Sequence, residues 1–151
     1  MMKDKEHAAE WVAIDKIKKW DKNPRRNAAA VDKVADSIRR FGFGAPIVAR
    51  KFDGTIIAGH TRFAAALQLG LDRVPVRYMA LDPADARLLA LADNKLGEIA
   101  EWDQPLLKDI FESEDFDITD LKIAGFDFDA MGELFGDSPD FGEEQDIIEE
   151  R

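Results

Sequence analysis

The chain has 151 residues, no cysteine and a formal net charge of −10 at pH 7. The absence of cysteine excludes disulfides, thiolate metal sites and cysteine redox chemistry. No apolar run approaches the ~20 residues that a membrane span needs, and the charged first residues are not typical of a secretion signal. We therefore expect a soluble cytoplasmic protein without a membrane partner, in which one main domain carries extensions.

The charge is divided unequally along the chain. Residues 1–80 hold 16 basic and 9 acidic side chains, whereas residues 81–151 hold 5 basic and 22 acidic ones. The basic part is suited to the phosphates of a nucleotide or a nucleic acid. The acidic part would repel a polyanion, which argues against DNA wrapping the whole protein. It is typical of a solvating tail or of a docking segment for a basic partner.

The first elements are a strand, a basic loop and a helix. A short strand is expected over residues 12–14, after a flexible lead-in over 1–10. Pro24 then marks a loop that carries Arg25 and Arg26. Apolar residues at spacings of three and four predict a helix over 28–41 that buries one face and ends at Gly42. The residues of this face are Val31, Val34, Ile38 and Phe41.

A hairpin and a tight turn follow the helix. Asp53-Gly54 separates two β-like runs, 46–50 and 55–58, and predicts a hairpin. The second run ends at Gly59, and a helix-forming run begins two residues later and closes at Gly70. The first amides of a helix lack partners and attract anions, and Arg62 adds a cation suited to phosphate. The turn is thus a candidate phosphate site, or an ordinary strand-to-helix connection with a surface arginine.

The next strand and helix carry two unusual features. A strand is expected over 74–78, and Pro75 predicts that it lies at a sheet edge or starts there, since proline cannot donate to a ladder. Asp82 and Pro83 predict the start of a long helix. Asp93 and Asn94 lie within this helix, where both are unfavourable. Their placement indicates either a functional site or an exposed face.

The last part of the chain is acidic. Trp102 and Asp103 begin a further helical segment, and Asp127 or Asp129 would cap a last short helix. The expected buried face and satellite core of this part consist of Leu106, Leu107, Ile110, Phe111, Ile118, Leu121, Ile123 and Phe126. We expect four regions: the lead-in 1–10, a binding domain 11–100, a helical extension 101–135 and a disordered acidic tail 136–151.

The order of these features resembles the N-terminal domain of the ParB/sulfiredoxin superfamily, often labelled the ParB-like nuclease domain. The resemblance rests on the proline-arginine loop, Phe41-Gly42-Phe43, the hairpin, Gly59-His60-Thr61-Arg62 and Val74-Pro75-Val76. It covers roughly residues 11–130. The segment Leu91–Leu96, with Trp102-Asp103, looks like ParB-like domains that occur beside or fused to DNA adenine or cytosine methyltransferases in phages and mobile elements.

The resemblance implies an α/β (α+β) fold, with a small mixed sheet and packed helices. It also implies a nucleoside triphosphate, CTP or ATP, bound with Mg²⁺ at the turn. The phosphate-binding residues would be Gly59, His60, Thr61, Arg62 and Arg25, with Arg26 as a further candidate. Asp93 and Asn94 take the place of a Glu-Asn pair that supports metal binding and hydrolysis. Both are therefore candidate metal ligands, and Asp93 is the candidate catalytic residue.

The chain departs from the family pattern at the turn and in the long helix. Gly-His-Thr-Arg replaces the Gly-Glu-Arg-Arg that is usual in the ParB branch, and Asp93 is shorter than the usual Glu. His60 stands where sulfiredoxins carry their reactive cysteine, so sulfiredoxin chemistry is excluded. No helix-turn-helix or dimerisation domain is recognised in this sequence, and we do not expect centromere-specific binding from it.

Three functions compete at this stage. The leading hypothesis is a nucleotide-binding domain in a DNA-related role, such as an accessory to DNA modification or partition. Its partners would be DNA and a DNA methyltransferase or another phage protein. The second is a metal-dependent DNA nuclease that uses His60, Asp93 and Asn94 at the same site. The third is a non-catalytic adaptor that acts through its acidic tail, and enzymatic activity as a triphosphatase or nuclease stays open.

Overall fold

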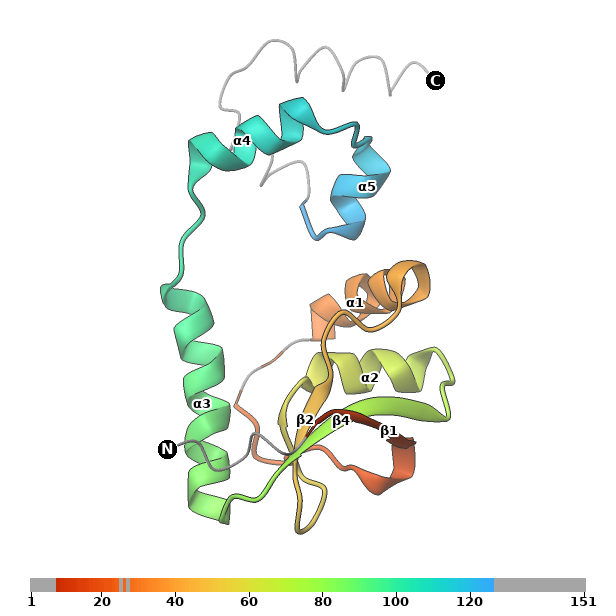
Figure 1. Cartoon of the computed structure of the whole chain (residues 1–151), viewed down its shortest axis with the longest axis vertical. Helices are drawn as coiled ribbons and strands as arrows, with labels where there is room; N and C mark the ends of the chain where they lie inside the picture. The colour runs from red at the N-terminus through yellow and green to blue at the C-terminus, as the bar shows by residue number, and fades with distance from the viewer. Residues whose placement is uncertain (1–7, 25, 27, 127–151) are drawn as a thin grey trace. The chain divides into compact units, whose positions relative to one another are not determined.

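The computed structural model describes residues 8–126 except 25 and 27, and the chain divides into two compact units after Ala100. Among the described helices, none is long and apolar enough to cross a bilayer. The elements of the first unit (Figure 1) are β1 (Glu10–Ala13), a 3-10 turn (Ile14–Lys16), α1 (Ala28–Phe41), β2 (Ile47–Arg50), β3 (Ile56–Ala58), α2 (His60–Gln68), β4 (Arg73–Met79) and α3 (Pro83–Ile99). Those of the second unit are α4 (Gln104–Ser113) and α5 (Ile118–Ile123).

The first unit is built on a four-stranded mixed sheet with the strand order β1-β4-β2-β3. β2 and β3 form the predicted antiparallel hairpin. β4 runs antiparallel to β1 and parallel to β2. A parallel pair needs a crossover connection, and the chain supplies it through β3 and α2. The predicted fold class, a small mixed sheet with packed helices, is confirmed.

β4 lies inside the sheet, so the prediction that Pro75 marks an edge strand or a strand start is wrong. β1 pairs with residues 73–76 of this strand, whereas β2 pairs with residues 76–79. The two ladders therefore overlap only at Val76. Pro75 faces one partner strand, through Trp11, at a point where the β2 ladder has not begun. Pro75 thus has a paired neighbour on one side alone, as a residue of an edge strand does, although β4 is an interior strand.

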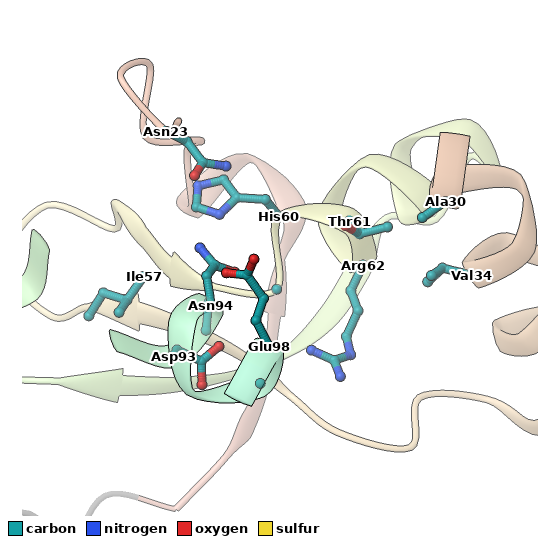
Figure 2. A pocket seen from close by; sticks show the side chains of 13 residues that line it. Asn23, Ala30, Val34, Ile57, His60, Thr61, Arg62, Asp93, Asn94 and Glu98 are labelled. Carbon is teal, nitrogen blue, oxygen red and sulfur yellow. The ribbon is translucent and has the colours of Figure 1, made fainter. Parts of the chain in front are cut away.

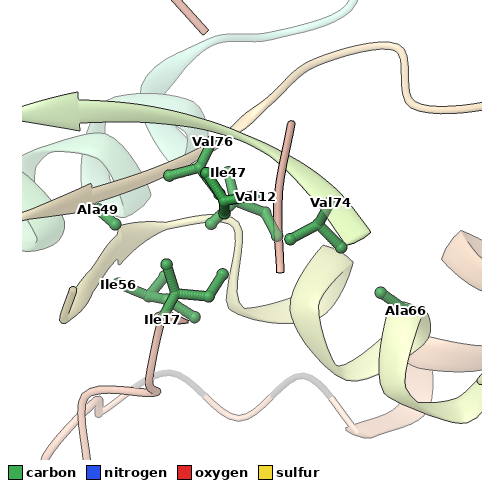
Figure 3. Packing of buried hydrophobic residues seen from close by; sticks show 8 residues of the cluster. All are labelled: Val12, Ile17, Ile47, Ala49, Ile56, Ala66, Val74 and Val76. Atoms are coloured by element: carbon green, nitrogen blue, oxygen red, sulfur yellow. The ribbon is translucent and has the colours of Figure 1, made fainter. Parts of the chain in front are cut away.

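The buried core lies on both faces of the sheet. Neighbouring residues of a strand point to opposite faces, and Ile56 and Ile57 accordingly belong to different clusters. The larger cluster includes Ala66 of α2, which places α2 on its face (Figure 3); its members are Val12, Ile17, Ile47, Ala49, Ile56, Ala66, Val74 and Val76. The smaller cluster joins Ile57 to Ala86 and Ala90 of α3. β3 thus leads into α2 on one face while α3 covers the other.

Helix starts agree well with the sequence, whereas one predicted core position does not. Asp82 caps α3 as predicted, since its side chain accepts a hydrogen bond from the Asp85 amide. α1 has the predicted bounds, with its buried position at Ala35. Phe41 is 68% exposed, so its prediction as part of the buried face is wrong. It is the last residue of α1, and its ring lies 5.1 Å from the Arg40 guanidinium.

The described residues of the second unit form a small aromatic cluster rather than a buried core. The rings of Trp102 and Phe111 lie 5.7 and 5.1 Å from that of Phe126. Leu106 and Ile110 are exposed, so the prediction of a buried face is wrong for both. None of the described residues in this unit is fully buried. The predicted short helix after Asp127 and the predicted acidic tail lie outside the described residues.

Candidate functional site

The turn after β3 is shaped by Gly59. Its φ of 98° lies in the left-handed region that favours glycine, and it precedes the first residue of α2. A Cβ at this position would lie 3.2 Å from the Ile47 Cα, so the turn also passes close to β2. No side chain caps α2. A helix start without a capping side chain is the kind of site that attracts an anion.

A pocket of about 440 Å³ surrounds this turn (Figure 2). Four segments of the first unit supply its walls: the loop before α1, α1 itself, the β3–α2 turn and α3. The lining residues are Asn23, Ala30, Val34, Ile57, Ala58, Gly59, His60, Thr61, Arg62, Asp93, Asn94, Gly97 and Glu98. The fold thus joins residues more than seventy positions apart in one cavity.

Six of the site residues predicted from the sequence line this one pocket. Gly59, His60, Thr61 and Arg62 come from the turn, and Asp93 and Asn94 from α3. Arg25 lies outside the described residues. Arg26 lines a neighbouring pocket of about 610 Å³ that shares Asn94 and Glu98 with the first.

The charged side chains of the pocket are not engaged with one another. Figure 2 shows Arg62 extending from α2, and Asp93 and Glu98 from α3. Within residues 8–126, leaving aside 25 and 27, these three side chains make no ion pair or hydrogen bond. Arg62 is only half-buried. Because its guanidinium also lacks a partner among the described residues, it is available to an anionic ligand. One wall of the pocket offers positive charge and helix amides, and the other offers carboxylates.

Glu98 and Asn23 line the pocket but were not predicted from the sequence. Glu98 lies four residues after Asn94 in α3, which places both on one side of that helix. With Asn94 as a candidate, this spacing alone would have predicted that Glu98 lies beside it. Asn23 comes from a loop with no chemical signature of its own, and only the folded chain brings it to the turn.

The oxygen donors on α3 suit a metal ion that a ligand helps to hold. Asp93 and Glu98 offer carboxylates, and Asn94 offers an amide oxygen. No three His, Cys, Asp or Glu side chains gather into a metal site in the part of the chain that the structure describes. Mg²⁺ commonly takes one or two protein carboxylates and completes its shell with phosphates and water. The donor set therefore fits Mg²⁺ that arrives with a phosphate ligand.

His60 connects the turn to the loop before α1. The Trp20 amide donates a hydrogen bond of 3.2 Å to Nε2 of His60. Burial lowers the pKa of the His60 imidazole, which favours its neutral form. A neutral ring that accepts at Nε2 carries its proton on Nδ1. The backbone carbonyl of Trp20 in turn accepts a hydrogen bond of 3.0 Å from the backbone N–H of Asn23, which continues the connection to the pocket wall.

Residues 2–95 match the family model of the ParB N-terminal domain. A probable plasmid-partitioning protein ParB of Thermus thermophilus is 38% identical over 73 residues, which cover 47% of this chain and 25% of that protein. A nucleoid occlusion protein of Bacillus cereus is 38% identical over 69 residues, which cover 44% of this chain and 24% of that protein. The match thus spans about a quarter of the length of these curated relatives.

A solved structure shares the fold. The C-terminally truncated chromosome-partitioning protein ParB of Caulobacter crescentus, in complex with CTP-gamma-S, aligns with a TM-score of 0.57 and 20% identity. The alignment covers 87% of this chain and 72% of that one. At this identity the likeness concerns the fold alone.

Proposed function

The chain belongs to the ParB N-terminal domain family, and we propose that its pocket binds a nucleoside triphosphate, CTP or ATP, together with Mg²⁺. The observation that carries this proposal is the pairing of two unlike walls in one cavity. The uncapped start of α2 and the unpaired Arg62 face the same space as Asp93, Asn94 and Glu98.

Each wall would meet a different part of the ligand. The Gly59–Arg62 turn would hold phosphate oxygens through backbone amides and the Arg62 guanidinium. Asp93, Asn94 and Glu98 would hold Mg²⁺, which would offset the repulsion between carboxylates and phosphates. The volume of about 440 Å³ falls within the range of roughly 300–1,000 Å³ that small-molecule sites occupy.

The family and its members favour a DNA-related role for this binding. The relatives are a plasmid-partitioning protein and a nucleoid occlusion protein, and a ParB of the same fold was crystallised with CTP-gamma-S. We propose partition, or an accessory function in DNA modification, with DNA as a partner. We also propose a DNA methyltransferase or another phage protein as a partner, because the segment Leu91–Leu96 looks like ParB-like domains that occur beside DNA methyltransferases.

Nuclease activity is not proposed. Metal-dependent cleavage of a phosphodiester commonly uses a richer set of ligands and two ions. Among the described residues, the pocket contributes two carboxylates and no group of three metal-ligating side chains. An adaptor role for the acidic tail stays a prediction, because that tail lies outside the described residues.

Calorimetry with CTP, ATP, GTP and UTP tests the proposal, with and without Mg²⁺. We expect binding of CTP or ATP that requires Mg²⁺ and that Arg62→Ala abolishes. Arg39→Ala is the matched control, since Arg39 lies on α1 in a pair with Asp36 and does not line the pocket. Ligand at about 100 times Kd should also stabilise the protein by about 2.7 kcal/mol. The absence of binding by any of the four nucleotides would overturn the proposal.

A further inference from the structure

The loop that brings Asn23 to the pocket is attached to the turn through His60. The connection has two steps. The backbone N–H of Trp20 donates to His60 Nε2 at 3.2 Å, and the backbone N–H of Asn23 donates to the Trp20 carbonyl at 3.0 Å. The first bond joins residues forty positions apart in the sequence, and the second closes a turn between neighbouring residues of the loop. Figure 2 shows the His60 ring beside Asn23, at the edge of the pocket.

Trp20 is fixed from a second direction. Its side chain packs against the smaller core cluster, which contains Ile57 and the α3 residues Ala86 and Ala90. The core therefore holds the ring of Trp20, while His60 holds its backbone. The loop residues after Trp20 reach the pocket from this fixed point, since the backbone N–H of Asn23 is hydrogen-bonded to the Trp20 carbonyl.

The same hydrogen bond determines what the His60 side chain offers a ligand. Nε2 accepts from Trp20, so the ring is neutral and this nitrogen has no proton to donate. The positive charge of the pocket comes from Arg62 and from the start of α2 instead. The backbone amide of His60 still belongs to the uncapped first turn of the helix.

We propose that His60 is a positioning residue, whose Nε2 holds the 20–24 loop so that Asn23 forms part of the nucleotide site. The proposal rests on the proposed function, because it assigns the loop to that same site. Nucleotide affinity then depends on a hydrogen-bond acceptor at position 60 and not on a positive charge there.

Two substitutions separate these roles. His60→Gln keeps a side-chain acceptor, whereas His60→Leu has none. We expect hydrogen exchange at the Trp20 amide of the ligand-free protein to be faster in His60→Leu and restored toward wild type in His60→Gln. Loss of one hydrogen bond implies that affinity for CTP with Mg²⁺, or ATP with Mg²⁺, falls about two- to tenfold in His60→Leu. His60→Gln should lie within about twofold of wild type, since it restores that bond.

Asn23→Ala provides a second route that leaves the His60–Trp20 bond in place. We expect wild-type exchange at the Trp20 amide and weaker nucleotide binding. Wild-type affinity in Asn23→Ala would overturn the role of the loop, and this variant keeps the test open if His60→Leu does not fold. Unchanged Trp20 exchange in a folded His60→Leu variant, or no restoration by His60→Gln, would overturn the role of Nε2.

The two proposals fail in different ways. If the wild-type protein binds no nucleotide, the proposed function fails, and the assignment of the loop to a nucleotide site fails with it. Exchange at Trp20 in the ligand-free protein would still report whether His60 holds the loop. If nucleotide binds with equal affinity to wild type and to a folded His60→Leu variant, the proposed function stands and the role of His60 does not.

Discussion

The two walls of the pocket differ in how firmly the core supports them. The turn wall precedes α2, whose Ala65 and Ala66 are fully buried, and Gly59 lies against β2. The other wall lies on α3, whose buried residues are Ala86 and Ala90. The last buried residue, Ala90, comes before the three polar pocket residues of α3, which are Asp93, Asn94 and Glu98. The turn wall is therefore built into the core, whereas the α3 wall lies on a stretch of helix with little packing to fix it.

Under the proposed function, this difference suits the two walls to separate tasks. A wall fixed by packing is preorganised, so that binding there requires little ordering. A wall on a less packed helix can adjust to a metal ion, whose ligands must meet its geometry closely. Substitutions that alter the packed backbone of the turn should therefore disturb folding, whereas substitutions on the outer part of α3 should change binding and leave folding intact.

Gly59→Ala should have the largest effect on stability. The left-handed φ and the approach to the Ile47 Cα act together, and we expect a loss of about 2–4 kcal/mol. Gly42→Ala is the matched control, since Gly42 has a φ of 83° and an added Cβ would meet nothing within 4 Å. That control should lose only about 1–2 kcal/mol. Urea unfolding measures both, and equal losses would show that close packing does not fix the turn wall.

Substitutions of the α3 carboxylates should act on binding and leave stability nearly unchanged. Asp93→Asn and Glu98→Gln remove charge without much change of shape, and we expect affinity for nucleotide with Mg²⁺ to fall about tenfold, or about 1.4 kcal/mol. Removal of Mg²⁺ with EDTA should abolish binding by the variants and by wild type alike. Asp85→Asn, in the first turn of α3 and outside the pocket, is the control. Equal affinities in Mg²⁺ would exclude these carboxylates as ligands.

Gly97→Ala should stabilise the protein modestly. Gly97 lies inside α3, where an added Cβ would meet nothing within 4 Å. Alanine in a helix interior is favoured over glycine by about 0.5–1 kcal/mol. The melting temperature checks this result. A loss of stability would mean that this end of α3 is not helical in solution, and the comparison between the two walls would need revision.

The pH dependence through His60 should be the smallest effect. Burial lowers the pKa of His60 in the folded protein, so the unfolded chain takes up a proton first. This contribution to stability is present above the ordinary value of about 6.5 and is lost as pH falls below it toward the folded-state pKa. Arg62, Asp93 and Glu98 are the charged groups that line the same pocket.

Urea midpoints between pH 7.5 and 5.0 measure this effect. His60→Gln does not titrate in this range, and its midpoint should fall less than that of wild type. Parallel curves for the two proteins would show that His60 does not contribute.

Local signals predicted much of this fold because they act within a few residues. The Asp82-Pro83 start of α3 and the Asp53-Gly54 hairpin depend on backbone preferences that the residues themselves set. Gly59 is a similar case, since its positive φ belongs to the turn. These signals placed the start of α2 within one residue of His60, where the structure begins it.

The remaining features depend on contacts between distant parts of the chain. The exposure of Phe41 and the interior position of β4 follow from tertiary packing, which no local pattern contains. The pocket that both Asn23 and Glu98 line exists only in the folded unit. The roles of Gly59–Arg62, Arg25, Asp93 and Asn94 stay predictions, as do the domain boundaries.

The strand order also constrains the sequence of events during synthesis. β1 and β2 each pair with β4, and they share only Val76 of that strand. Among the described strands, β1 has no other partner. A nascent chain that ends before residue 73 can form the β2–β3 hairpin but cannot attach β1. The sheet is completed by a contact between its first and last strands, a non-local step of the kind that slows folding.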